Sequence, residues 1–117
     1  MTVQDLADYG FNVDEALELC IGDEEILMEV LETALDEGKE KIPLMNELMA
    51  NNDMDRYIIE AHGLKNAAKQ IGADVLSETA KASELDGKAG NIDSMKARHQ
   101  ELMDLYQKTL DAMEMLF

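Results

Sequence analysis

One stretch of the sequence decides the fold: Ala61-His62-Gly63-Leu64-Lys65-Asn66-Ala67-Ala68-Lys69-Gln70-Ile71-Gly72. Successive residues of an α-helix are rotated by about 100°, so side chains three and four positions apart lie on one face. At that spacing the apolar residues in and just before the stretch form a single stripe: Tyr57, Ala61, Leu64, Ala68 and Ile71. The stretch is therefore predicted to be a helix that buries this face against other helices.

His62 lies well away from the middle of this stripe, and is predicted to face water. Lys65, Asn66 and Lys69 follow it at three, four and seven positions, so they stand beside it on the same side of the helix. Gly63 comes directly after the histidine, although glycine inside a helix costs roughly 1 kcal/mol relative to alanine. An exposed imidazole that another molecule must approach closely would explain this arrangement.

The composition predicts a small all-α domain. The 117 residues are enough for one domain with one core, and 46% of them are apolar, as in globular proteins. Only 4% are aromatic, there is a single proline, and runs of β-branched residues are absent. Helices with a core of Leu, Ile, Met and Ala are the structure that this composition favours.

The formal net charge of −16 narrows the choice of partners. Nucleic acids and anionic membrane surfaces attract basic proteins, so we expect neither as a partner. The charge is unevenly distributed, because no Asp or Glu occurs in residues 61–73, which contain Lys65 and Lys69. We therefore expect a neutral-to-positive island around His62 on an otherwise acidic body.

Cysteine usage and hydropathy give the expected compartment. Cys20 is the only cysteine, so an internal disulfide is excluded, and its apolar neighbours predict a buried side chain and not a reactive thiol. The sequence shows no signal peptide and no apolar run near the length of a membrane span. A cytoplasmic protein is the expectation.

Capping and turn signals divide the chain into helices. Residues 1–22 are predicted to form two short helices, one capped by Thr2 and stopped by Gly10, the other starting with a capping box at Asn12. Four longer helices are expected in the rest of the chain, at 23–50, 53–71, 74–89 and 92–116. Their expected N-caps are Asp23, Asp53 and Asp74.

The short turns between the long helices imply antiparallel neighbours. The sequence therefore predicts an up-down-up-down antiparallel four-helix bundle over 23–117, with short N-terminal helical additions, in a single domain of residues 1–117. Pro43 removes one backbone hydrogen bond of the first long helix, and Gly38 is close to it. A bend or a break is expected there, in residues 38–43.

The motif around His62 is similar to that of a known family. Ala61-His62-x-Leu64-Lys65, a Gly72-Ala73 pair ten residues after the histidine, and Leu76 together resemble the histidine-containing phosphotransfer (HPt) domain. Further similarities extend the resemblance to nearly the whole chain: Gly10-Phe11, Gly22 to Glu25, and Ser83-Glu84 followed by Gly90-Asn91. Two positions depart from the family pattern. Asn66 stands where the family usually has glycine, and Ser83-Glu84 stands where it often has Leu-Glu.

The resemblance implies a histidine phosphotransfer protein of a two-component phosphorelay. His62 would be the phosphoacceptor, carrying a phosphoryl group from the phospho-aspartate of one receiver domain to the aspartate of another. The partners would be receiver domains of response regulators or of hybrid histidine kinases, and these would supply Mg²⁺. The chain would be a monomeric carrier with no cofactor of its own and no kinase activity.

Chemistry at the residue level agrees with this role for His62. A neutral imidazole is a good nucleophile near pH 7, since its reference pKa is about 6.5. Lys65, one turn further on, can neutralise the charge that a phosphoryl group brings. The second histidine, His99, falls on the apolar stripe of the last helix, and is predicted to be a hydrogen-bonded residue at the bundle edge.

The surroundings of His62 predict a docking face for the receiver, and leave some roles open. Its residues would be Ile58, Ile59, Gly63, Asn66 and Lys69. One of the two isoleucines is expected to be covered by the N-terminal helices, and the other to form an apolar patch. For Asn66 a hydrogen bond to the phosphoryl group and a plain surface position are equally plausible. For Lys69 a functional role and a position on a solvated face are equally plausible. Glu84 stands where some members of the family have a polar residue near the histidine on the adjacent helix, but a solvated acid is the favoured expectation.

Other functions were weighed against the carrier. A non-phosphorylated helical adaptor that binds a signalling regulator through the same face is the alternative, although an adaptor would not need the pair His62 and Lys65. A metal-storage bundle would require Glu-x-x-His, which does not occur, and no EF-hand loop is present. The lack of a glycine-rich phosphate loop argues against an ATP site.

Overall fold

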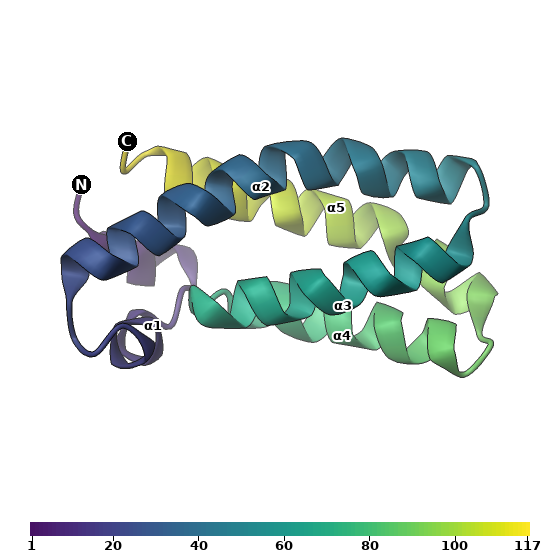
Figure 1. The fold of residues 1–117 in the computed structure, drawn as a ribbon, viewed down its shortest axis with the longest axis horizontal. Helices are drawn as coiled ribbons and strands as arrows, with labels where there is room; N and C mark the ends of the chain where they lie inside the picture. Colours follow the sequence, from purple (N-terminus) through teal and green to yellow (C-terminus); the bar gives the residue numbers. More distant parts are fainter.

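The computed structural model describes the whole chain, Met1–Phe117, and all of its regular elements are helices (Figure 1). In chain order they are η1 (Val3–Tyr9), α1 (Val13–Leu19), α2 (Glu24–Ala50), α3 (Met54–Gln70), α4 (Asp74–Lys88) and α5 (Ile92–Glu114). The predicted all-α class is confirmed. The four long helices begin and end within about two residues of the predicted positions, which is the usual uncertainty of helix ends.

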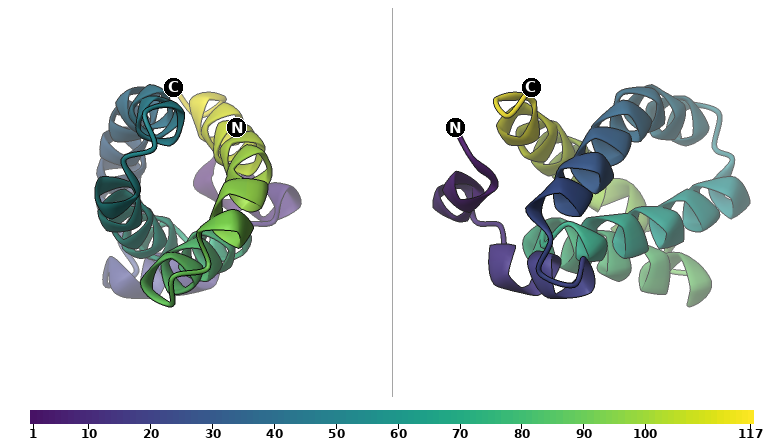
Figure 2. Two further views of the ribbon diagram at one scale, coloured as in Figure 1. Left: turned by 90° about the vertical axis from the view of Figure 1, so that its right-hand side faces the viewer. Right: turned by 60° about the vertical axis from the view of Figure 1, so that its left-hand side comes forward.

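The four long helices pack around one core. Contacts join α2 to α3, α3 to α4, α4 to α5, and α5 back to α2. Each of these helices runs opposite to the one before it (Figure 1), and the end-on view in Figure 2 shows them surrounding a common axis. The space between them is filled by one continuous cluster of buried apolar side chains, mostly Leu, Met and Ala.

The N-terminal segment covers one end of this arrangement. η1 contacts α2 and α5, while α1 contacts α2 and α3. The backbone N–H of Asn12 donates to the carbonyl of Gly72 at 2.8 Å. Gly72 has φ +74°, and a Cβ there would collide with the backbone of Asn12. Glycine is therefore needed where α3 ends, both for the turn and for the close approach of the N-terminal segment.

Two of the three N-caps predicted for the long helices are confirmed. The carboxylate of Asp23 accepts from the backbone N–H groups of Glu25 and Ile26, and that of Asp53 accepts from the N–H of Arg56. The third prediction is wrong. Ala73 is the N-cap of α4, and Asp74 is its first helical residue, with a carboxylate that accepts from Lys69. Asp74 still lies in the first turn, where a negative charge is favourable.

Pro43 does not break α2, which is helical from Glu24 to Ala50. Of the predicted bend or break, the break is therefore wrong, because Pro43 is exposed on a helix whose inner face is held by packing, and the bend stays a prediction. Gly38 serves close packing, because a Cβ at this position would lie 2.5 Å from a methyl carbon of Leu110 and 3.1 Å from the ring of Tyr106. This glycine lets α2 approach α5.

Candidate functional site

His62 lies in the middle of α3, with 51% of its side chain exposed. The residues of its helix that are buried are Tyr57, Ala61, Leu64 and Ala68, as the periodicity predicted. The prediction that His62 points away from this stripe is confirmed. The imidazole does not stand free in water, however, because it faces a side chain of α4.

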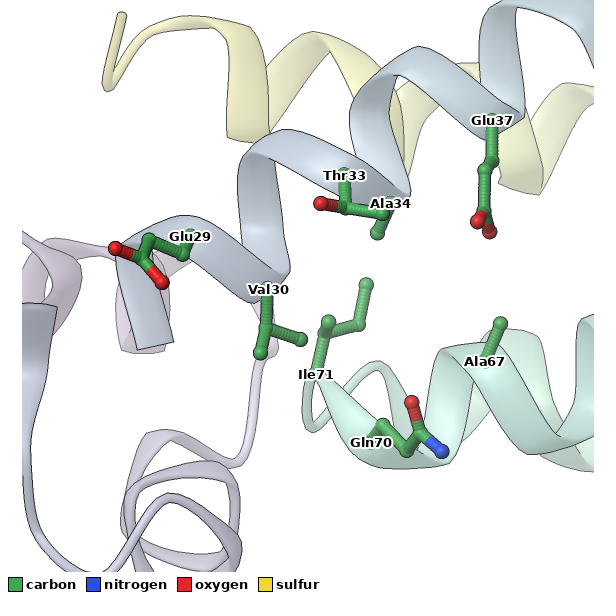
Figure 3. A pocket seen from close by; sticks show the side chains of 8 residues that line it. All are labelled: Glu29, Val30, Thr33, Ala34, Glu37, Ala67, Gln70 and Ile71. Carbon is green, nitrogen blue, oxygen red and sulfur yellow. The ribbon is translucent and has the colours of Figure 1, made fainter. Parts of the chain in front are cut away.

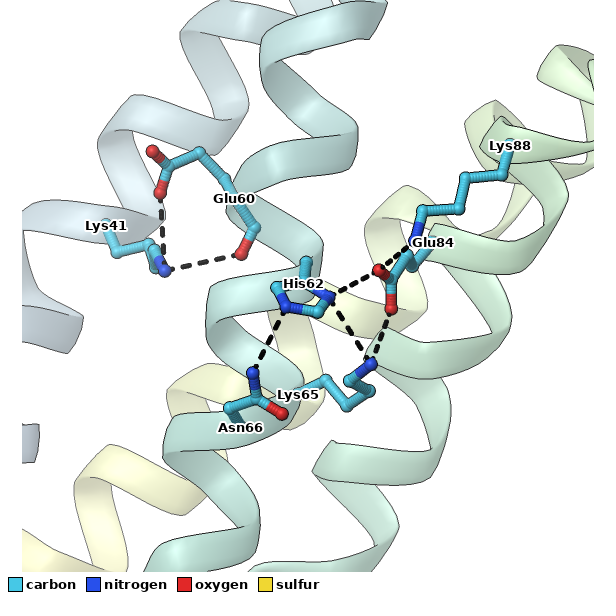
Figure 4. A network of polar contacts seen from close by, with 7 residues as sticks. All are labelled: Lys41, Glu60, His62, Lys65, Asn66, Glu84 and Lys88. Carbon is cyan, nitrogen blue, oxygen red and sulfur yellow. Dashed lines mark hydrogen bonds and ion pairs between the residues drawn. The ribbon is translucent and has the colours of Figure 1, made fainter.

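That side chain is Glu84, which accepts hydrogen bonds from three residues (Figure 4). Its Oε2 lies 2.5 Å from Nδ1 of His62 and 2.9 Å from Nζ of Lys88, and its Oε1 lies 2.8 Å from Nζ of Lys65. Only 2% of the Glu84 side chain is exposed. The prediction of a solvated acid is wrong, because Glu84 lies on the inward side of α4 against α3.

The carboxyl group of Glu84 is ionised across the physiological range. Burial acts to raise its pKa, but hydrogen bonds from Lys65, Lys88 and His62 outweigh burial and lower the pKa to about 2. A carboxylate can only accept hydrogen bonds, so Nδ1 of His62 must carry the proton in its bond to Glu84. Of the two neutral tautomers of the ring, the hydrogen-bond network therefore selects the one whose lone pair is on Nε2.

Nε2 of His62 faces Asn66, whose amide Nδ2 lies 3.3 Å away. An amide nitrogen is a donor, and the deprotonated Nε2 is an acceptor, so this contact agrees with the assigned tautomer. Asn66 is exposed. The residue that departs from the family pattern therefore lies directly beside the nitrogen that has a free lone pair.

The two lysines of the predicted island have different surroundings. Lys65 is 24% exposed, and besides bonding Glu84 it places Nζ 3.4 Å from Nδ1 of His62. Lys69 instead pairs with Glu15 at 2.9 Å and with Asp74 at 3.3 Å, and these hydrogen bonds raise its pKa. The prediction of a neutral-to-positive island is wrong in this respect. Acidic side chains of α1 and α4 pair with the two lysines, although residues 61–73 contain no acid.

The structure also separates the two isoleucines of the expected docking face. Ile59 is 67% exposed. Ile58 is half-buried, and a Cβ at Gly87 of α4 would collide with its side chain. The expectation that the N-terminal helices cover one isoleucine is therefore wrong, because α4 covers Ile58 through the close approach that Gly87 allows.

Gly63 has a neighbour of its own. The side chain of Lys41 extends from α2 to α3. Its Nζ donates to the carbonyl of Glu60 and pairs with the carboxylate of the same residue, both at 3.3 Å (Figure 4). A Cβ at Gly63 would lie 3.0 Å from this Nζ. The glycine thus makes room for a side chain of the protein itself.

His99 confirms the prediction of a hydrogen-bonded residue at the bundle edge. It is half-buried, its Nδ1 lies 2.7 Å from the hydroxyl of Tyr57, and its Nε2 lies 2.8 Å from Oδ1 of Asn46. Burial lowers the pKa of His99. Both ring nitrogens are engaged in joining α2, α3 and α5, so neither is available as a nucleophile.

One hollow of the surface adjoins the site, and its lining residues are Lys65, Asn66, Lys69, Asp74, Ser77, Glu78 and Lys81. A groove between α2 and α3 is lined by Glu29, Val30, Thr33, Ala34, Glu37, Ala67, Gln70 and Ile71 (Figure 3). It contains no histidine, cysteine or lysine. No group of His, Cys, Asp and Glu side chains is arranged to hold a metal ion, and none of the helices has the length and apolar character that crossing a membrane requires.

Comparison with protein families shows to which family the chain belongs. The family model described as the Hpt domain matches residues 29–114. The chain belongs to the Hpt domain family. The match covers most of the four long helices and includes His62, Lys65 and Glu84, whereas η1 and α1 lie outside it. Comparison with curated proteins and with solved structures gives no match.

Hpt domains are phosphocarriers of phosphorelays, and in this member the residues around the histidine include two that sequence reasoning missed. The sequence favours a solvated acid at Glu84 and gives no indication of a role for Lys88. A signal for Glu84 was present in the sequence: it follows Ala80 by four residues and precedes Gly87 by three, on the side of α4 where small residues allow close helix packing. An acid on such a face requires a partner.

Proposed function

We propose that this Hpt domain accepts a phosphoryl group on Nε2 of His62 from the phospho-aspartate of a receiver domain, and passes it to the aspartate of a second receiver. One observation carries the proposal: the exposed imidazole has its Nδ1–H held by the buried, ionised Glu84, which leaves the lone pair on Nε2. A nucleophile must present a lone pair in a fixed orientation, and this contact provides both conditions.

The transfer needs no separate base. The lone pair of Nε2 forms the N–P bond while the P–O bond of the acyl phosphate breaks, and the donor aspartate leaves as a carboxylate with the bonding electrons. The ring then carries a positive charge that is shared by both nitrogens. Glu84 stabilises this charge through its bond to Nδ1–H, and the proton stays on Nδ1. Transfer to the second receiver reverses these steps.

Lys65 and Asn66 are the residues proposed to contact the phosphoryl oxygens. Both lie beside the imidazole, with Nζ of Lys65 at 3.4 Å from Nδ1 and Nδ2 of Asn66 at 3.3 Å from Nε2. Each is a donor, and hydrogen bonds from an ammonium group to a phosphate are among the stronger ones in proteins. Asn66 must turn away from Nε2 before the N–P bond forms.

The proposed docking face for the receiver surrounds His62. Ile59 supplies exposed apolar area, and Gly63, Asn66 and Lys69 complete the face, with a smaller contribution from the half-buried Ile58. The receiver provides the aspartate and the Mg²⁺, so this chain needs no cofactor and acts without kinase activity of its own. We also propose that the chain is a monomer and that it acts in the cytoplasm.

The architecture in this proposal is an up-down-up-down antiparallel four-helix bundle, with residues 1–22 as an N-terminal addition. The ring of contacts among α2, α3, α4 and α5 supports it, as do their alternating directions (Figure 1). His62 lies where α3 packs against α4, with 51% of its side chain exposed.

The test uses receiver domains that have been charged with radiolabelled acetyl phosphate and are then mixed with the chain. We expect label to appear in the unaltered chain and in His99→Gln, and to be absent from His62→Gln. The label should be lost in acid and retained in base, as a phosphoramidate is. His62→Gln should keep its helical circular dichroism, because a surface substitution costs about 0.5 kcal/mol or less.

Label on His62→Gln, or label that survives acid, would refute the carrier. The alternative is then a helical adaptor that binds a signalling regulator through the same face without being phosphorylated. An adaptor would bind a receiver without taking up label on His62, so receiver binding by the unaltered chain without labelling of His62 identifies an adaptor.

A further inference from the structure

Glu84 is bonded by more ammonium groups than are needed to neutralise its single negative charge. Nζ of Lys65 bonds its Oε1 at 2.8 Å, and Nζ of Lys88 bonds its Oε2 at 2.9 Å. The same Oε2 accepts from Nδ1–H of His62. One ammonium group would neutralise the carboxylate, so the second requires an explanation.

The two lysines differ in the helix that carries them and in what else they contact. Lys88 lies one turn after Glu84 on α4, so the partners of this pair belong to one helix, and the lysine side chain is 59% exposed. Lys65 lies one turn after His62 on α3, and its Nζ is 3.4 Å from the imidazole. Lys65 therefore contacts both the carboxylate and the ring that would carry a phosphoryl group, whereas Lys88 contacts the carboxylate.

We propose that Lys88 is a positioning residue that holds Glu84, so that Lys65 is free to turn to the phosphoryl group on His62. This rests on the function proposed above. A phosphoryl group brings a charge of about −1.5 to −2 and three strong acceptor oxygens. Lys65 is the nearest cation, but in the unloaded protein it is bound to Glu84.

Lys88 removes the conflict between these two partners of Lys65. If Lys65 turned away from a carboxylate that had no other cation, a buried charge would be left without an ammonium group, which is strongly unfavourable. With Lys88 in place, Glu84 keeps one ammonium group and the N–H of His62. No proton has to move, and the tautomer that presents Nε2 is preserved.

The test compares rates of labelling by a charged receiver in three variants. Lys88→Gln should slow labelling roughly tenfold, the rate effect of losing one charge-assisted hydrogen bond. Lys88→Arg should restore most of the rate, since its guanidinium also bonds Glu84. Lys108→Gln is the control, because it removes an exposed lysine of α5 that lies away from His62 and should leave the rate unchanged.

A double variant distinguishes positioning from a general effect of charge. Lys65→Gln should slow labelling strongly when Lys88 is present, and only slightly in the Lys88→Gln background, because there Lys65 is already held by Glu84. Melting curves by circular dichroism check that each variant is folded, which is expected since Lys88 is exposed.

Two results would overturn the role of Lys88 while the carrier function stands: a rate for Lys88→Gln equal to that of Lys108→Gln, or equal effects of Lys65→Gln in both backgrounds. If the unaltered chain takes no label from any charged receiver, the carrier function fails, and the role of Lys88 fails with it.

Discussion

Glu84→Gln removes one negative charge from the interior with almost no change in shape, and its effect on stability can be worked out from the structure. The pKa of Glu84 is lowered from 4.5 to about 2, and its side chain is almost wholly buried, so solvent screens the interaction little. Such a lowering corresponds to about 3 kcal/mol of folding free energy. A carboxyl group with a lowered pKa stabilises the folded state at pH values above its pKa in the unfolded chain. This contribution is therefore present above about pH 4.5 and is lost as the pH falls toward 2.

The assay is urea unfolding followed by circular dichroism at several pH values between 7 and 2. At pH 7 we expect the free energy of unfolding of Glu84→Gln to be about 3 kcal/mol lower than that of the unaltered chain. The two free energies should become equal near pH 2. Glu78→Gln, an exposed acid of the same helix, should differ by about 0.5 kcal/mol or less. The same difference between Glu84→Gln and the unaltered chain at pH 7 and at pH 2 would refute the reasoning.

Three further substitutions test the packing around the site by the same unfolding measurement. Ser83→Ala should stabilise by up to about 1 kcal/mol, because the Ser83 hydroxyl is fully buried without a hydrogen-bond partner; a loss of stability would reveal an unseen partner. Gly87→Ala should destabilise by about 1–2 kcal/mol, because the clash with Ile58 exceeds the gain in helix propensity, and unchanged stability would contradict the close approach of α3 and α4. His99→Gln should cost about 1–2 kcal/mol by weakening the bond to the buried Tyr57 hydroxyl, and a neutral result would show that this bond contributes nothing.

Local sequence patterns predicted the helices well, because the relevant interactions lie within a few residues. The stripe of Tyr57, Ala61, Leu64 and Ala68 fixed both the helix and the outward direction of His62. The caps Asp23 and Asp53 act on backbone groups two or three residues away. Such features depend on the period of the helix and on short-range hydrogen bonds, which a single sequence records.

Partners that come from another helix could not be predicted in this way. Lys69 appeared unpaired because no acid is close to it in the sequence up to Ala73, yet Glu15 of α1 reaches it in the fold. The N-terminal helices were the wrong prediction for what covers one of the two isoleucines, because α4 covers Ile58 through Gly87, which is far along the chain. The identity of the packed faces depends on how the helices are arranged, and periodicity within one helix does not give it.

The position of Glu84 also determines how the charge at the site changes when the carrier is loaded. Before loading, the ammonium groups of Lys65 and Lys88 and the carboxylate of Glu84 leave a single net positive charge beside the imidazole, on a chain whose formal charge is −16. In the proposed function the phosphoryl group adds about −1.5 to −2, which more than cancels this charge. The unloaded site is thus the locally favourable place for an anionic group on an acidic surface, and the loaded site is not. An arrangement of this kind favours acceptance by the empty carrier and release by the full one, and it depends on a carboxylate and two lysines that meet only when α3 and α4 pack together.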